Sequence, residues 1–239
     1  RRQRQMCIRD REHGWIGRLR PVGVAMLGLQ RESGSWSRIW ERLLVGAPQD
    51  YPDRREVLEV GLAWLAGHET IPGYDFVLQR MLARRGLLGP DERYRLRTRV
   101  RSWLTENPGH AGWGHLWKTL YDEVSAEKED PVEELRDEVW SMGLQWVEEQ
   151  QGRRWWPHVC VGMYFRAVHR RDEPSRRALA RLARRGLPYY HGSKQEYGLM
   201  VVVYRTVKEL AEPRLSEGLE RETLDWLARN GHRPGWPRT

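Results

Sequence analysis

The sequence lacks the features that mark several common classes of protein. It has two cysteines, Cys7 and Cys160, in 239 residues. So few argue against a disulfide-stabilised secreted domain and are typical of a reducing compartment. It has no run of about 18 apolar residues, so no membrane-spanning helix is expected. It has only two phenylalanines, and four of its 41 basic residues are lysines. We therefore expect a cytoplasmic protein that does not span a membrane.

Sequence motifs for nucleotide, metal and acyl-transfer chemistry are also missing. There is no GxxxxGK[ST] or GxGxxG loop for a nucleotide phosphate, and no HExxH or CxxC for a metal ion. No serine lies in a GxSxG context. Cys160 falls at an apolar helix position and is interpreted as a buried structural thiol. The sequence thus predicts a protein that is not an enzyme, with no catalytic residue, no cofactor and no metal site.

Tryptophan is abundant, with 13 residues, and several indoles recur at one spacing. Four pairs of aromatic residues lie ten positions apart: Trp64 and Tyr74, Trp103 and Trp113, Trp146 and Trp156, and Trp226 and Trp236. Each pair encloses a few polar residues and a Pro or Gly. This pattern is typical of the end of one helix, a tight turn and the start of the next. The sequence therefore predicts helical hairpins.

The helix after each turn repeats one apolar face. Its aromatic first residue is followed by apolar residues at +3, +4, +7 and +8, as on one side of an α-helix. The first residues are Trp36, Tyr74, Trp113, Trp156 and Tyr197, about 40 positions apart. The period is close to that of HEAT-like repeats. We predict an all-α fold, an α-solenoid of about five stacked helix–turn–helix repeats over residues 34–239, with an irregular multi-helix bundle as the alternative.

Residues 1–33 do not fit this repeat and are interpreted as an N-terminal segment, the remnant of a preceding domain. The chain begins Arg1-Arg2-Gln3-Arg4, without an initiator methionine or the apolar core of a signal peptide. We expect it to be a piece of a longer protein.

The net charge of +8 includes an arginine-rich stretch over residues 166–185, which we call the arginine ridge. An acidic stretch covers residues 122–138. In a stack of helices the two stretches either neutralise each other or the arginines are offered to an acidic partner. An arginine surface could also bind the phosphates of a nucleic acid. The sequence leaves these interpretations open.

Candidate partner-binding residues come from this ridge and from two turns. Trp155 lies outside the apolar pattern and follows two arginines, so we expect a surface contact patch there. The turn over residues 186–197 is longer than the others, and an insertion in a repeat turn is either a tolerated loop or a binding site. The candidates are Arg153, Arg154, Trp155, Arg170, Arg171, Arg176, Arg177, Arg184, Arg185, Tyr189, Tyr190 and His191.

The recurring order of Trp-Leu, polar turn, aromatic residue and apolar face resembles the α-helical repeats in the C-terminal sensor arms of bacterial STAND (NACHT-type) defence proteins. The resemblance covers residues 34–239 and implies ligand sensing or partner docking. We therefore expect a non-enzymatic scaffold or sensor that binds a protein partner. Such a scaffold could be the recognition arm of a larger defence or signalling protein. A solenoid that binds nucleic acid is the alternative, and the sequence leaves the oligomeric state open.

Overall fold

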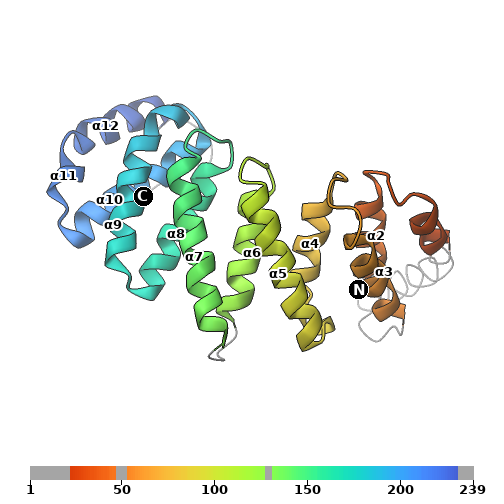
Figure 1. The fold of residues 1–239 in the computed structure, drawn as a ribbon. Coiled ribbons are helices and arrows are strands. Elements are labelled where there is room, and N and C mark those ends of the chain that lie inside the picture. Colours follow the sequence, from red (N-terminus) through yellow and green to blue (C-terminus); the bar gives the residue numbers. More distant parts are fainter. Residues whose placement is uncertain (1–21, 47–52, 127–130, 231–239) are drawn as a thin grey trace, which may run out of the picture. The chain divides into compact units, whose positions relative to one another are not determined.

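The computed structural model describes residues 22–46, 53–126 and 131–230, and within these ranges the chain forms helices and turns but no β-strand (Figure 1). Residues 22–29 are helical. The helices that follow are α2 (Trp36–Gly46), α3 (Asp53–Leu65), α4 (Tyr74–Leu82), η1 (Arg85–Leu87), α5 (Pro90–Glu106), α6 (Trp113–Ser125), α7 (Pro131–Glu149), α8 (Trp156–Arg170), α9 (Glu173–Gly186), η2 (Leu187–Tyr190), α10 (Lys194–Leu210), α11 (Pro213–Ser216) and α12 (Leu219–Asn230). The all-α prediction is confirmed. Among the described residues, no helix combines the length and the apolar character needed to cross a bilayer.

The ten-residue aromatic spacing marks hairpin turns, as predicted, in the described part of the chain. Helices α4, α6 and α8 begin at the second aromatic residue of a pair, and α3, α5 and α7 end within three residues of the first. Gly73 and Gly152 have φ angles of 95° and 86° in two of these turns. Glycine adopts this left-handed backbone without the steric cost that a Cβ atom would bring. Trp236, the last member of the pattern, lies outside the described residues.

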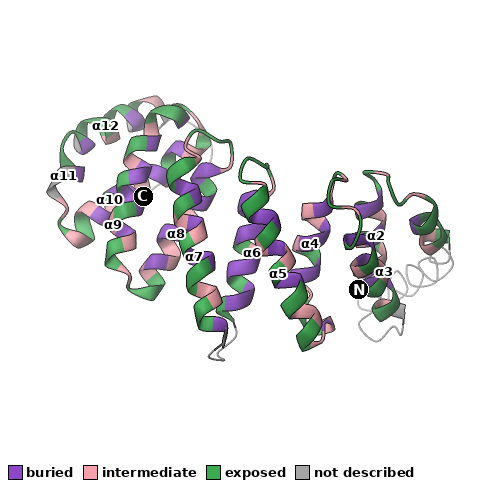
Figure 2. Cartoon of the chain, viewed as in Figure 1, coloured by how far each residue is buried: buried purple, intermediate pink, exposed green. Residues whose placement is uncertain are grey.

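The chain divides into two compact units. One comprises the described residues of Arg1–Glu106 and Thr119–Glu127, and the other those of Asn107–Lys118 and Lys128–Thr239. The boundary falls within α6. In both units each long helix carries buried residues along one side and exposed residues along the other (Figure 2). Each unit is therefore built from amphipathic helices around its own interior.

Indole N–H groups and the hydroxyl of Tyr74 donate hydrogen bonds to backbone carbonyls and hold the hairpins together. Within a hairpin, the aromatic residue that starts the second helix donates to the carbonyl nine residues earlier: Trp36 to Leu27 (3.0 Å), Tyr74 to Leu65 (3.3 Å) and Trp156 to Val147 (2.6 Å). Between hairpins, indoles donate to a neighbouring carbonyl: Trp40 to Val57 and Trp117 to Val139 (2.8 Å each), and Trp64 to Arg31 and Trp146 to Pro108 (2.7 Å each). A buried indole thus keeps its polar group satisfied while it fills the interior.

Two helical glycines, Gly61 and Gly143, each three residues before a tryptophan, allow close contacts between hairpins. A Cβ atom at Gly61 would lie 2.5 Å from Nε1 of Trp40, and one at Gly143 would lie 2.6 Å from Cε2 of Trp117. Real Cβ atoms do not approach other atoms so closely. Each glycine therefore makes room for the indole that bonds across to its helix.

The fifth copy of the apolar face was predicted wrongly. Tyr197 and Tyr204 are 46% and 53% exposed, although the pattern placed both in the interior. The buried residues of α10 are instead Glu196, Leu199, Met200, Val202, Val203 and Thr206. Helix α10 begins at Lys194, three residues before Tyr197, because the longer turn ends earlier than the pattern assumed. The packing against α8 and α9 then sets which side is buried.

Tyr190 takes the place that tryptophan has in the other hairpins. Its ring stacks on Trp156 with centroids 5.8 Å apart, as Trp146 stacks on Trp113 at 4.5 Å. Its hydroxyl donates to the carbonyl of Arg153 at 2.6 Å. Burial raises the pKa of Tyr190 to about 12, so the hydroxyl remains a donor near neutral pH. The hairpin of α9 and α10 therefore keeps the same interior contact with a smaller aromatic residue.

Residues 22–33, part of the predicted N-terminal segment, belong to the first hairpin. Leu27 and Arg31 accept the indole hydrogen bonds of Trp36 and Trp64. Residues 1–21 lie outside the described part of the chain. The interpretation of these residues as the remnant of a preceding domain therefore stays a prediction.

Candidate partner-binding surface

The twelve predicted residues lie in the second unit, but at opposite ends of its helices. Helices α8 and α9 are joined by a short link after Arg170, so the two run antiparallel (Figure 1). Arg170, Arg171, Arg176 and Arg177 lie at this link, which we call the linker end. The others lie at the opposite end, where the α7–α8 and α9–α10 turns are, which we call the turn end. A 15-residue helix such as α8 is about 22 Å long. The candidates therefore do not form one site.

Most of the arginine ridge is paired with carboxylates of neighbouring helices. The ion pairs are Arg170 with Asp137 (3.0 Å), Arg176 with Glu209, Arg177 with Glu212 (3.4 Å), Arg181 with Glu212 (3.9 Å) and Arg184 with Glu222. Four of the five join the ridge to residues further along the chain, in α10 to α12. Arg170 pairs with the acidic stretch over residues 122–138, as one of the two interpretations expected, whereas the other four arginines pair with carboxylates outside that stretch. These ion pairs reduce the charge that the ridge offers to a partner.

Arg176 is an interior residue, with only 8% of its surface exposed. Its guanidinium lies over the ring of Tyr164, 5.7 Å from the centroid, and pairs with Glu209. Hydrogen bonds from Arg205 and then Arg176 hold the pKa of the Glu209 carboxyl below its usual range. The hydroxyl of Tyr164 also accepts a hydrogen bond from Thr206 at 3.0 Å. Arg176 thus ties α9 to α8 and α10.

At the turn end, side chains of one turn lie over the glycine of the preceding turn. A Cβ atom at Gly109 would lie 3.4 Å from Nη2 of Arg153, and one at Gly152 would lie 3.6 Å from Cδ1 of Tyr189. Tyr189 is 66% exposed, whereas Tyr190 is buried at 8%. Successive turns are therefore in contact, and Arg153 and Tyr189 both lie on the surface that they share.

Trp155 is half-buried at this end and lies among two histidines and an arginine. The ring of His115 meets it edge-on with centroids 5.0 Å apart, and that of His158 lies 5.5 Å away at a tilt of 40°. The guanidinium of Arg154 lies 5.4 Å from the indole centroid. We call Arg153, Arg154, Trp155, His115 and His158 the Trp155 patch.

Arg153, Arg154 and Trp155 were predicted from charge and from the apolar pattern, whereas the two histidines were not predicted. His115 comes two residues after Trp113, which starts α6, and His158 comes two residues after Trp156, which starts α8. Equivalent positions on successive hairpins lie side by side in a repeat. That shared position was the signal that could have brought the histidines into the predicted patch.

The two arginines of the Trp155 patch differ from the five paired arginines of the ridge. Both are exposed, and within the described part of the chain neither forms an ion pair. An exposed guanidinium presents a planar set of donors suited to a carboxylate or a phosphate. The patch therefore offers unpaired positive charge beside an aromatic ring.

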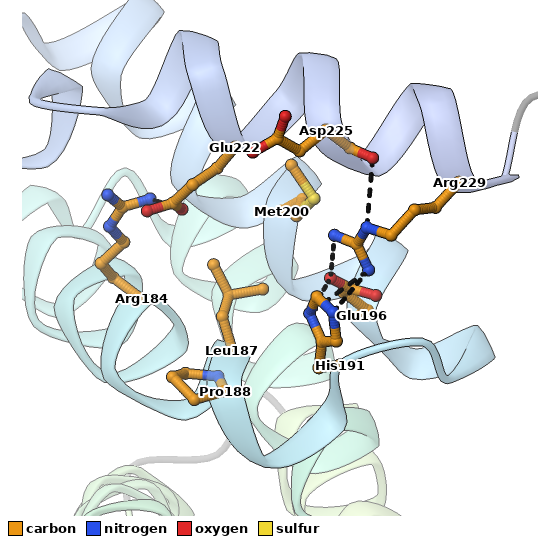
Figure 3. A pocket seen from close by; sticks show the side chains of 9 residues that line it. All are labelled: Arg184, Leu187, Pro188, His191, Glu196, Met200, Glu222, Asp225 and Arg229. Carbon is orange, nitrogen blue, oxygen red and sulfur yellow. Dashed lines mark hydrogen bonds and ion pairs between the residues drawn. The ribbon is translucent and has the colours of Figure 1, made fainter.

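A cleft of about 450 Å³ lies next to the α9–α10 turn, between that turn and α12 (Figure 3). Its lining residues are Arg184, Leu187, Pro188, His191, Glu196, Met200, Glu222, Asp225 and Arg229. Figure 3 shows Arg184 and Glu222 on one side and His191, Glu196 and Arg229 on the other, with Leu187 and Met200 between them. The cleft thus has charged sides and an apolar centre.

The charged groups on both sides of the cleft are engaged with one another. Glu196 is 4% exposed and accepts a hydrogen bond from the backbone N–H of Gly192 at 2.7 Å. Its other oxygen lies 3.4 Å from Nη2 of Arg229 and 3.5 Å from Nδ1 of His191. On the other side, Arg184 pairs with Glu222 and donates to the carbonyl of Glu217 at 2.9 Å. The apolar centre of the cleft, at Leu187 and Met200, takes no part in these bonds.

Other features offer less to a ligand. A second cleft, of about 290 Å³, is lined by stacked Trp36 and Trp64 beside residues 24–31. Burial raises the pKa of the Cys160 thiol and keeps it protonated. Within the described ranges, no three His, Cys, Asp or Glu side chains are placed to hold a metal ion.

No known family, curated protein or solved structure matches the chain in the comparisons made with each. The residues of the turn end are therefore the basis for a functional proposal.

Proposed function

We propose that the chain is a non-enzymatic helical-repeat scaffold or sensor that binds an acidic segment of a protein partner at the turn end of its second unit. The observation that carries the proposal is the contrast between two sets of arginines. Five arginines of the ridge are paired with carboxylates, whereas Arg153 and Arg154 are exposed beside Trp155 and form no ion pair with a described residue. Aromatic residues and arginine are the side chains most enriched where proteins bind one another.

The contacts of Trp155 favour a protein partner over a single-stranded nucleic acid. Binding of single strands without sequence preference uses several aromatic rings on which successive bases stack. Trp155 is one half-buried ring, and His115, His158 and Arg154 already lie against it. The ion pairs of the ridge also reduce the charge that a phosphate backbone would need. Nucleic-acid binding is therefore the alternative that the test must exclude.

The wider architecture belongs to the same proposal. Indole bonds between successive hairpins support a solenoid of stacked repeats, a form that presents a long, rigid surface to a partner. The resemblance to STAND sensor arms supports a role as the recognition arm of a larger defence or signalling protein. A cytoplasmic location fits both.

Binding of defined probes tests the proposal. We expect a fluorescently labelled decapeptide rich in glutamate to bind the protein, as measured by fluorescence anisotropy at several salt concentrations. The double variant Arg153→Gln/Arg154→Gln should weaken this binding about ten-fold, because two charge-assisted contacts are lost. The control variant Arg38→Gln/Arg42→Gln removes the same charge from exposed positions of α2 and should bind as the unmodified protein does.

Two outcomes would contradict the proposal. Equal binding by the Arg153/Arg154 variant and the control would show that the patch is not the binding site. Tight binding of labelled single- or double-stranded DNA with a steep salt dependence, together with no binding of the acidic peptide, would favour the nucleic-acid alternative.

A further inference from the structure

The Trp155 patch and the cleft are adjoining parts of one surface. Tyr189 lies against Gly152, next to Arg153, and its neighbour Pro188 lines the cleft together with His191. The 3-10 helix η2, in the α9–α10 turn, therefore connects the two. A segment that crosses Tyr189 from the patch comes directly to the opening of the cleft.

We infer that the acidic partner segment also carries a bulky apolar residue, and that this residue inserts into the cleft between Leu187 and Met200. The inference rests on the proposed function, since it adds an anchor residue to the same partner. It assigns two chemistries to one segment, with carboxylates at the Trp155 patch and an aliphatic or aromatic side chain in the cleft.

The charge distribution of the cleft selects an apolar side chain. Arg184 is paired with Glu222, and Arg229 is held by Glu196 and His191, so neither side offers an unpaired cation to a ligand. An anionic ligand would have to displace one of these bonds. An apolar side chain gains by leaving water for the space beside Leu187, Pro188 and Met200, and it disturbs none of them.

The size of the cleft agrees with such an anchor. Protein interiors contain few voids larger than a water molecule, whereas this cleft has a volume of about 450 Å³. Sites that bind ligands are clefts of about 300–1,000 Å³ with largely apolar linings and a few placed polar groups. Peptide segments are commonly held by one or a few apolar anchors in pockets, with charged residues outside them.

A series of synthetic peptides tests this inference. Each labelled peptide carries four glutamates, a Gly-Ser spacer of between none and about six residues, and then a leucine. Its matched partner has serine in place of that leucine. We expect the leucine peptide to bind about ten-fold more tightly than the serine peptide at the best spacing, since a fully buried aliphatic side chain contributes that much or more.

Variants of the protein locate the effect. Leu187→Trp fills the cleft and should abolish the difference between the two peptides without weakening the serine peptide. Leu224→Trp, an equal change at an exposed position of α12 outside the cleft lining, should preserve the difference. Arg153→Gln/Arg154→Gln should weaken both peptides by the same factor.

Hydrogen exchange of the unmodified protein gives a second measurement that does not depend on the folding of Leu187→Trp. The leucine peptide should slow amide exchange in residues 187–200 and in α12 more than the serine peptide does. Equal affinity of the two peptides at every spacing, or an undiminished preference in a folded Leu187→Trp variant, would overturn the inference while leaving the proposed function in place. Failure of both peptides to bind, or binding that ignores Arg153 and Arg154, would instead remove the proposed function.

Discussion

The close contact between Trp117 and Gly143 depends on the absence of a side chain at residue 143. The indole of Trp117 donates to the carbonyl of Val139, one turn before Gly143 on α7, and its ring occupies the space that a side chain would fill. Trp40 and Gly61 repeat the arrangement in the other unit. The glycine lowers the intrinsic stability of its helix by about 1 kcal/mol, and the close approach of the indole offsets that cost.

We expect Gly143→Ala to lower the free energy of unfolding by about 1–3 kcal/mol, because the new methyl group would overlap the buried ring of Trp117. Chemical denaturation followed by circular dichroism measures this loss. Alanine is otherwise the better helix former, so intrinsic propensity alone would give the opposite sign.

The same substitution at Gly28 is the control. Gly28 is helical and exposed, and a Cβ atom there would meet nothing within 4 Å. Gly28→Ala should leave stability unchanged or raise it by up to about 1 kcal/mol. A gain of stability at both positions would show that the indole does not confine Gly143.

Single residues were predictable from the sequence where one helix face decided their place. The buried tryptophans of the ten-residue aromatic pairs belong to this group. Arg176 and Tyr190 do not, because their burial depends on partners 33 and 37 residues away. An arginine or tyrosine in a local pattern gives no sign that a distant glutamate or carbonyl will satisfy it in the interior.

At the scale of the helix, the start of α5 shows how a terminus is joined to its neighbour. The backbone N–H of Gly89 donates to the carboxylate of Glu92 at 2.8 Å, which satisfies a donor at the helix N-terminus. Arg55 of α3 donates to the same carboxylate at 2.9 Å. These bonds from Arg55 and then Gly89 hold the pKa of the Glu92 carboxyl below its usual range.

This lowered pKa gives α5 a pH-dependent contribution to stability. Because the folded pKa lies below the unfolded value of about 4.3, the contribution is fully present above that value and is lost as the pH falls through the folded pKa. Glu92→Gln should therefore destabilise the protein at pH 7 and progressively less as the pH is lowered towards 3. Unfolding free energies measured across this range test the trend.

Glu56→Gln, at an exposed position of α3, is the control variant for the pH experiment. It should give a smaller loss at pH 7 that varies less with pH. A destabilisation by Glu92→Gln that stayed constant from pH 7 to pH 3 would mean that the side chain contributes by packing and not by its charge.

Helices as elements were largely predictable, and their registers less so. The aromatic pairs placed the turns before α4, α6 and α8, because Pro and Gly between two apolar faces indicate a break. For α10, the predicted start was wrong by three residues and the predicted apolar face by one. Its start depends on how far the 3-10 helix η2 extends after α9, and that follows from the stacking of Tyr190 on Trp156.

At the scale of the whole molecule, the division into two units predicts where a local defect is felt. In repeat proteins each hairpin contacts only its neighbours, and parts of the chain open separately. We expect Gly143→Ala to speed amide exchange in α7 and α8 while leaving α3 and α4 unchanged. Gly61→Ala, which sets a Cβ atom against Trp40, should do the reverse.

Native-state hydrogen exchange with peptide-level resolution makes this comparison directly. Uniform loss of protection throughout both units, from either variant, would show that the described chain opens as one cooperative body. The pair of variants controls for the substitution itself, since each replaces a helical glycine beside an indole.

The candidate site was less predictable than the fold at this scale. Twelve residues were proposed from charge and from turn length, and the structure separates them between two ends of the same helices. Local sequence indicates which residues are basic or lie in a long turn. It does not indicate which carboxylates the arginines meet, since Arg176, Arg177 and Arg184 pair with glutamates 33 to 38 residues further along the chain.

The four indole bonds described between hairpins end on main-chain oxygen atoms. Every amino acid supplies such an acceptor, so the bond itself makes no demand on the side chain of the acceptor residue, whereas the rings of Trp40 and Trp117 need glycine at positions 61 and 143. A hairpin could therefore be exchanged for another during evolution as long as that glycine is kept. The same rule would let a protein engineer replace one hairpin without redesigning the acceptor side chains of its neighbour.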